Sequence, residues 1–253
     1  LSQSEPWIRI SPKPIESNLN EIIQIPNSDR IMAIGSGASI MYSDDMGENW
    51  HVIYKPAGIS RFITLNAIHF VDSNIGYVVG SKSTILKTID GGYSWALISI
   101  PGEQNIADVF FHSELIGSII RPGKILKTED GCQTWDSITV YGSNLQYISD
   151  SIGFIGIVNN SFFYKTEDAG NSWNQLYINP LIDNFKITSI EFIDSEVGII
   201  GGKISSSSSV DYFILKTIDG GISWFEVYTD NWNSISDIFF LNDTTRMLTF
   251  KLI

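Results

Sequence analysis

One short motif occurs five times in this chain, and this repetition constrains the fold more than any other feature. The motif has the consensus Ser/Thr-x-Asp-x-Gly-x-x-Trp, and only Cys132 departs from it, at the position of the glycine. The copies recur about every 43 residues, a period typical of architectures built from repeated supersecondary units. Their last residues are Trp50, Trp95, Trp135, Trp173 and Trp224.

A second feature precedes four of the motifs and follows the fifth. It consists of two short apolar segments separated by an acidic or Asn/Ser turn, and it occupies residues 67–80, 109–120, 146–158, 189–202 and 237–250. Apolar and polar residues alternate between frequent Gly, Asp and Asn breaks, and no segment keeps a helical period. Together with the repeat length, this predicts an all-β fold of four-stranded antiparallel blades, a β-propeller with almost no helix.

The number of blades follows from the number of units. Five units contain their own motif, and the end pieces, residues 237–253 and 7–10, together predict a sixth blade. In that blade the N-terminal strand closes the ring onto the C-terminal strands. We therefore predict one six-bladed β-propeller domain over residues 1–253. A seventh blade is the alternative, because the last unit is short and the chain could be trimmed.

The motif itself has the chemistry of a hairpin turn. Its Asp can accept hydrogen bonds from backbone N–H groups, the Ser or Thr hydroxyl adds another bond, and the Gly supplies a positive φ. The Trp begins the next strand and buries its ring against the turn. A left-handed conformation at Cys132 would cost about 1–2 kcal/mol. We interpret as structural the ten residues Asp45, Trp50, Asp90, Trp95, Asp130, Trp135, Asp168, Trp173, Asp219 and Trp224.

These motifs resemble Asp-box (BNR) repeats. The longer unit, F-x-D-x-x-x-G-x-x-x-G followed by I-L-K-T-x-D-G-G-x-S-W, resembles the photosystem II stability/assembly factor-like family of β-propellers, most clearly at residues 70–95. The resemblance extends from about residue 7 to 250. It implies a propeller whose boxes lie on the face away from any active site. Asp boxes also occur in sialidases, xyloglucan-degrading hydrolases and sorting receptors, so the box alone does not specify function.

Composition excludes several classes of function. The chain has 28 Asp and Glu against 16 Lys and Arg, a net charge of −12, so nucleic acid is not an expected partner. No apolar run reaches the roughly 18 residues of a transmembrane helix. A single cysteine excludes an internal disulfide, and the three histidines, His51, His69 and His112, lack the spacing of metal ligands. We expect no metal and no cofactor.

Candidate binding residues lie in the loops opposite the boxes, where propellers usually bind ligands. Trp232 is the one tryptophan outside the repeat position; it would serve as an exposed aromatic contact or pack as a loop anchor. Three cations are expected on this face, where they would either bind a carboxylate or be ordinary surface charges. Two aspartates are expected there as well, and they would either act as acid and base or cap turns. These five are Arg61, Arg121, Lys186, Asp183 and Asp230.

The sequence contains no recognisable catalytic constellation. We predict a non-catalytic scaffold for protein interaction or assembly, placed outside the cytoplasm (periplasm, cell surface or secreted), although this chain shows no targeting segment. The alternative is a glycan-binding or sialidase-like propeller, whose arginine triad is hard to build from five arginines, with residues 9–12 matching the expected Arg-Ile-Pro segment only partly. A third hypothesis makes the chain one module of a larger cell-surface protein.

Overall fold

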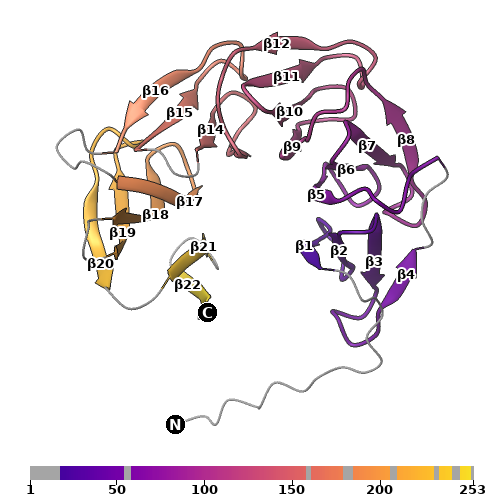
Figure 1. The fold of residues 1–253 in the computed structure, drawn as a ribbon, viewed down its shortest axis with the longest axis horizontal. Helices are drawn as coiled ribbons and strands as arrows, with labels where there is room; N and C mark the ends of the chain where they lie inside the picture. The colour runs from indigo at the N-terminus through magenta and orange to yellow at the C-terminus, as the bar shows by residue number, and fades with distance from the viewer. Residues whose placement is uncertain are drawn as a thin grey trace. The chain divides into compact units, whose positions relative to one another are not determined.

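The computed structural model describes residues 18–53, 58–157, 161–178, 185–205, 210–230, 234–240 and 246–251, with the backbone alone at residues 99, 185–186, 205, 228–230, 234–240 and 246–251. Every regular element in these segments is a β-strand. Five sheets contain four strands each, consecutive in the chain, and a last sheet contains two (Figure 1). The described residues contain no helix that could cross a membrane.

The chain divides into two compact units, Leu1–Glu114 and Leu115–Ile253. The strands of the first unit are β1 (Leu19–Gln24), β2 (Ile31–Gly35), β3 (Ser39–Ser43), β4 (His51–Ile53), β5 (Leu65–Phe70), β6 (Gly76–Gly80), β7 (Thr84–Thr88), β8 (Ala96–Ser99) and β9 (Asp108–Phe111). Neighbouring strands within the sheets β1–β4 and β5–β8 pair antiparallel.

The second unit continues the same pattern of antiparallel strands. Its strands are β10 (Gly117–Arg121), β11 (Lys124–Thr128), β12 (Asp136–Ile138), β13 (Asn144–Tyr147), β14 (Gly153–Gly156), β15 (Phe162–Thr166), β16 (Asn174–Tyr177), β17 (Phe185–Phe192), β18 (Val197–Ser205), β19 (Val210–Ile218), β20 (Phe225–Asp230), β21 (Ser234–Phe240) and β22 (Arg246–Lys251).

Burial changes across each sheet. All five residues of β6 and of β10 are buried, whereas the last strand of a sheet, such as β4 or β12, keeps two of its three residues exposed. β4 and β12 are also short, with three residues each. The apolar second strand therefore forms the buried centre of these sheets, and a short, exposed last strand offers little edge for further pairing.

The recurring phenylalanine and glycines of the unit have a packing reason. A Cβ on Gly76 would lie 2.7 Å from the ring of Phe70, and one on Gly198 would lie 2.6 Å from the ring of Phe192. A Cβ on Gly80 would lie 2.2 Å from the carbonyl oxygen of Thr64. The spacing F-x-D-x-x-x-G-x-x-x-G thus places one glycine under an aromatic ring and the other against a neighbouring backbone.

Each unit is held together by its own aromatic packing. In the first unit, Tyr77 stacks on Phe111, with ring centroids 3.6 Å apart. In the second unit, Phe154 stacks on Phe192 at 3.5 Å, and Phe163 packs against the same ring with centroids 6.0 Å apart. These residues are almost completely buried, so the aromatic contacts lie within the hydrophobic core.

The predicted strand pairs are confirmed, and so is the all-β class. The blade count and the single domain over residues 1–253 stay predictions, and residues 7–10, which were expected to close the ring, lie outside the described residues. β18 and β19 pair along their described length, from Val197 opposite Ile218 to Ser205 opposite Val210, and residues 206–209 lie outside the described residues.

Candidate binding site

Each Asp box folds as a turn closed by its own side chains. In the copy at Asp90, the Thr88 hydroxyl donates to Asp90 Oδ1 over 2.8 Å and accepts the Gly92 N–H at 2.9 Å. The Ser94 N–H donates to the same Asp90 oxygen at 2.9 Å. The same bonds recur around Asp45, Asp130, Asp168 and Asp219.

Two successive residues of each box are left-handed, one more than the sequence predicted. The expected one is the glycine, and Cys132 adopts it with φ 76°. The residue before it also has a positive φ, including Met46 and Ala169, both at 57°. Positive φ at both central residues defines a type I′ turn, whose twist matches that of the flanking strands.

The hydrogen bonds to the carboxylates change their acidity. The hydroxyl of Ser172 is the main reason why the pKa of Asp168 falls to about 2. The hydroxyls of Thr134 and Ser223 likewise lower the pKa of Asp130 and Asp219 to about 2, and at Asp45 the Ser43 hydroxyl is the main cause of a pKa of about 2. Burial raises the pKa of Asp90, but the bonds from Ser94 and Thr88 outweigh it and the net shift is downward. Both carboxylate oxygens are thus engaged within the turn, which supports a structural interpretation of the boxes.

The box tryptophans differ in their hydrogen bonding. Trp95 Nε1 donates to the Gly92 carbonyl at 3.0 Å, and Trp224 Nε1 donates to the Gly221 carbonyl at 3.1 Å. In the copies at Trp135 and Trp173 the Nε1 atom is buried and has no partner among the described residues. The indole hydrogen bond is therefore not needed to form the turn, since the side-chain bonds of the box are present in all five copies.

A cavity of about 230 Å³ lies in the first unit, at the end of the sheet β5–β8 opposite its Asp box. Three segments form its walls: the β4–β5 connection, the β6–β7 turn and the end of β8. The lining residues are Gly58, Ile59, Ser60, Ile63, Lys82, Ser83, Thr84, Leu97, Ile98 and Ile100. Half of these residues are isoleucine or leucine, and the others include three residues with hydroxyl groups and one lysine.

Next to this cavity, a tight turn points two side chains toward solvent. The N–H groups of Phe62 and Ile63 donate to the hydroxyl and the carbonyl of Ser60, at 3.2 and 3.1 Å. Ile63 is buried by this turn, whereas Phe62 keeps 74% of its surface exposed. The guanidinium carbon of Arg61 lies 5.0 Å from the centre of the Phe62 ring, within the range of a cation–π contact.

On the cavity's second wall, the β6–β7 turn is strained. Lys82 and Ser83 have φ values of 54° and 55°, although neither is glycine. The corresponding turns β2–β3 and β10–β11 each contain a glycine with positive φ. Gln104 holds the strained turn, because its carbonyl accepts the Ser83 N–H at 2.6 Å and its own N–H donates to the Ser83 hydroxyl at 3.2 Å.

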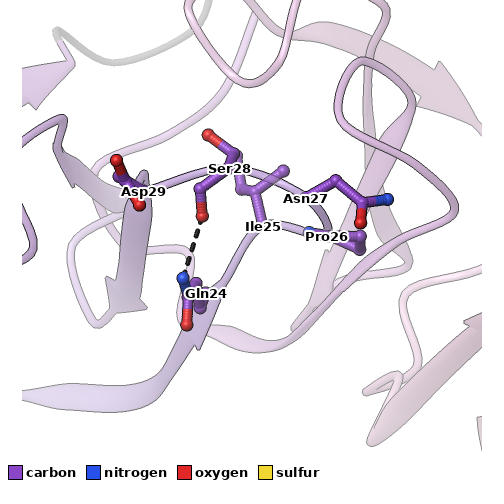
Figure 2. Close-up of a pocket in the computed structure, with 6 residues that line it drawn as sticks. All are labelled: Gln24, Ile25, Pro26, Asn27, Ser28 and Asp29. Atoms are coloured by element: carbon purple, nitrogen blue, oxygen red, sulfur yellow. Dashed lines mark hydrogen bonds between the residues drawn. The ribbon is translucent and has the colours of Figure 1, made fainter.

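A second hollow, about 530 Å³ and open to solvent, lies over the β1–β2 hairpin. Figure 2 shows its six lining residues, Gln24 to Asp29, all from one turn. Gln24 Nε2 donates across the hairpin to the Ser28 carbonyl at 2.9 Å. The amide of Gln24 is therefore already hydrogen-bonded within the hairpin. A hollow over a single hairpin offers little enclosure for a ligand.

Of the predicted binding residues, Arg61 and Arg121 are described with their side chains. Arg61 is exposed beside the cavity. Arg121, expected in a loop, is the last residue of β10 and only 8% exposed, and this burial lowers its pKa. Lys186 and Asp230, also expected in loops, lie in β17 and β20, where only the backbone is described.

Two further predicted residues, Asp183 and Trp232, lie outside the described residues. Sequence reasoning missed the cavity and Phe62. The available signal was an aromatic residue beside Arg61 in a loop already expected to face ligands.

The histidines do not form a metal site in the described part of the chain, which contains no group of three or more potential ligands. Burial is the main reason why the pKa of His69 falls to about 4. His69 Nε2 lies 2.9 Å from the Phe111 carbonyl, so it donates to that oxygen. His51 stacks on Tyr42, with ring centroids 5.2 Å apart.

Comparisons with known proteins agree with the repeated four-stranded sheets and Asp-box turns. The model of a family described as photosynthesis system II assembly factor YCF48 matches residues 54–145. The photosystem II assembly lipoprotein Ycf48 of Synechococcus sp. (strain CC9902) is 27% identical over an alignment of 123 residues, and the match covers 42% of this chain and 34% of that protein. The photosystem II stability/assembly factor HCF136, chloroplastic, of Arabidopsis thaliana is 23% identical over 202 residues, 77% of this chain and 44% of that protein.

Among solved structures, YCF48 bound to D1 peptide superposes with a TM-score of 0.62 at 16% identity, covering 84% of this chain and 81% of that one. The repeated four-stranded sheets, the Asp-box turns and this similarity of fold make the chain an Asp-box (BNR) repeat β-propeller. It resembles the photosystem II stability/assembly factor-like family. The chain spans less than half the length of the two curated relatives described above.

Proposed function

We propose that this chain is a non-catalytic scaffold that binds other proteins during the assembly of a larger complex. Its similarity to proteins named as assembly factors supports this role, as does its fold similarity to a protein solved with a bound peptide. The observation that carries the proposal is the exposed pair Arg61 and Phe62 beside the cavity of the first unit. Arginine and aromatic residues are enriched where proteins bind one another.

We also propose that the protein works outside the cytoplasm. One relative is named a lipoprotein, and a lipid anchor holds a protein at a membrane surface. The test is fractionation of native cells followed by protease treatment of cells stripped of their outer layers but with an intact cytoplasmic membrane. Protection of the chain from protease in these stripped cells, with cleavage only after the cytoplasmic membrane is lysed, would contradict this location.

Affinity capture with quantitative mass spectrometry tests the scaffold role. The bait is the full chain, and the variants are Phe62→Ala and Trp232→Ala. Ile89→Ala is the matched control, because Ile89 is 69% exposed but lies in the Asp box at the opposite end of the same sheet. We expect a specific partner that binds the purified wild type and Ile89→Ala equally and Phe62→Ala at least about tenfold more weakly, a difference of about 1.4 kcal/mol.

Two outcomes would reject the proposal. The first is the absence of any partner whose binding depends on the loop variants. The second is turnover of a panel of sialosides and glucans by the purified chain, which would favour the alternative of a glycoside hydrolase.

A further inference from the structure

We infer that the cavity of the first unit is a pocket for one aliphatic side chain of an extended peptide whose neighbouring residue carries a carboxylate. The inference rests on the proposed protein-binding function and specifies the ligand of the same site. It depends on three observations: the isoleucine and leucine side chains in the walls of the cavity, the cations beside it, and the strained turn that forms one wall.

The walls suit an aliphatic side chain. Ile59 and Ile63 are only 5% exposed, and Leu97, at 41%, lies where the cavity meets solvent. An apolar cavity of about 150 Å³ accepts a benzene-sized group, and about 230 Å³ therefore has room for a leucine or isoleucine side chain. Filling it releases water from apolar surface, which is the main source of affinity at such pockets.

Two cations lie at this cavity. Lys82 is exposed and lines it, and Arg61 is exposed and stands in the chain between the lining residues Ser60 and Ile63. Two exposed cations at one cavity are notable in a chain with net charge −12. A guanidinium presents paired N–H donors that match a carboxylate, so the favoured neighbour of the aliphatic residue is Asp or Glu.

The ring of Phe62 extends the contact beyond the cavity. Its 74% exposure makes it an apolar surface outside the pocket, and the Arg61 guanidinium already lies over it. A ligand that covers Phe62, fills the cavity and meets Arg61 must be long and thin. An extended peptide meets these requirements, whereas a compact small molecule would fill the cavity alone.

The β6–β7 turn supports a functional role for this wall. Both Lys82 and Ser83 are left-handed although neither is glycine, whereas the left-handed residues Ala38, Met46, Cys132 and Ala169 each share their turn with a glycine. Strain of this kind is concentrated at ligand clamps and other functional sites. The Gln104 bonds to Ser83 fix the turn, so Lys82 is presented at the rim by a rigid backbone.

The test is a methyl NMR titration of the full chain labelled at Ile and Leu methyl groups. The probes are blocked synthetic peptides with the cores Gly-Leu-Asp-Gly, Gly-Leu-Lys-Gly and Gly-Ala-Asp-Gly. We expect the Leu-Asp peptide to shift the methyl signals of Ile59, Ile63 and Leu97, and the other two peptides to bind at least about tenfold more weakly. The pocket is overturned if these signals stay unmoved at millimolar peptide, or if all three peptides shift them equally.

Two variants test the aliphatic pocket and the carboxylate contact separately. Arg61→Glu should reverse the preference, so that the Leu-Lys peptide binds more tightly than the Leu-Asp peptide; a variant that had merely lost its fold could not show a reversed preference. Leu97→Trp should fill the mouth of the cavity and abolish the shifts, while Ile89→Ala should behave as wild type. An unchanged preference in Arg61→Glu contradicts the proposed carboxylate contact.

The same variants distinguish this inference from the broader proposal. A captured partner that requires Phe62 but binds Leu97→Trp like wild type would overturn the side-chain pocket and leave the scaffold function standing. A partner indifferent to Phe62→Ala would reject the proposed binding face, whatever the peptides do.

Discussion

The ring of Tyr77 lies flat on the ring of Phe111, with centroids 3.6 Å apart and planes inclined by 7°, and the Tyr77 hydroxyl donates to the Glu114 carbonyl at 2.7 Å. Tyr77 is completely buried. One side chain thus joins β6 to β9 by stacking and, at its polar tip, to the turn after β9. The contact lies within the first unit and predicts how that unit responds to truncation.

Removing the ring and removing the hydroxyl should have different costs. We expect Tyr77→Ala to lower the free energy of unfolding by about 3–5 kcal/mol, because it leaves a large cavity. Tyr77→Phe should cost about 1–2 kcal/mol, because only the bond to the Glu114 carbonyl is lost. Urea unfolding followed by tryptophan fluorescence measures both. Equal effects of the two variants would show that the stacking contributes little.

The Asp boxes should make the protein sensitive to acid. The pKa of Asp168 is about 2 in the folded chain against an ordinary value of 3.8, so its stabilising effect is complete above about pH 4 and is lost as the pH falls toward about 2. We expect Asp168→Asn to be less stable than wild type near pH 6 and to lose less stability between about pH 5 and about pH 2. Urea midpoints across this range test it, with the exposed Asp29→Asn as control.

A second pH effect should appear in a higher window. Burial lowers the pKa of His69 to about 4, below the ordinary value of 6.5, so the folded chain favours the neutral ring. Stability present above about pH 6.5 should therefore be lost as the pH falls toward about 4. His69→Gln should flatten the urea midpoint between about pH 7 and about pH 5, and the exposed His51→Gln should not. Identical slopes for the two variants would contradict this assignment.

Two glycines allow steric crowding to be separated from backbone conformation. Gly80→Ala should cost more than about 2 kcal/mol, because its Cβ would lie 2.2 Å from the Thr64 carbonyl oxygen. Gly123 has φ 79°, but the atom nearest to an added Cβ is 3.5 Å away, so Gly123→Ala should cost only about 1–2 kcal/mol. Thermal and urea unfolding of both variants provide the comparison. A Gly80→Ala variant as stable as Gly123→Ala would mean that the sheet yields at this point.

Much of the fold could be predicted from the sequence, because the information is local. The five motifs indicate their turns, and the alternation of apolar residues indicates the strands on either side. The prediction was incomplete at Met46 and Ala169, because both adopt a positive φ although neither is glycine.

The candidate site could not be predicted in the same way. Its walls come from residues 58–63, 82–84 and 97–100, which meet only through the pairing of strands and the packing of loops. Arg61 was recognised because a cation in a loop is visible in the sequence. Phe62 and the turn at Lys82 were not recognised, because exposure and backbone strain are properties of the folded chain.

The side-chain hydrogen bonds that shape each Asp box lie within the box, from the Ser or Thr hydroxyl to the residue before the Trp. One backbone bond leaves it: the Gly91 N–H donates to the Asn74 carbonyl in the turn before β6, and Gly131, Ala169 and Gly220 donate in the same way to Leu115, Ser151 and Glu196. A box is therefore complete only together with the first hairpin of its own repeat, so the smallest segment that can be duplicated with all its bonds is a whole repeat.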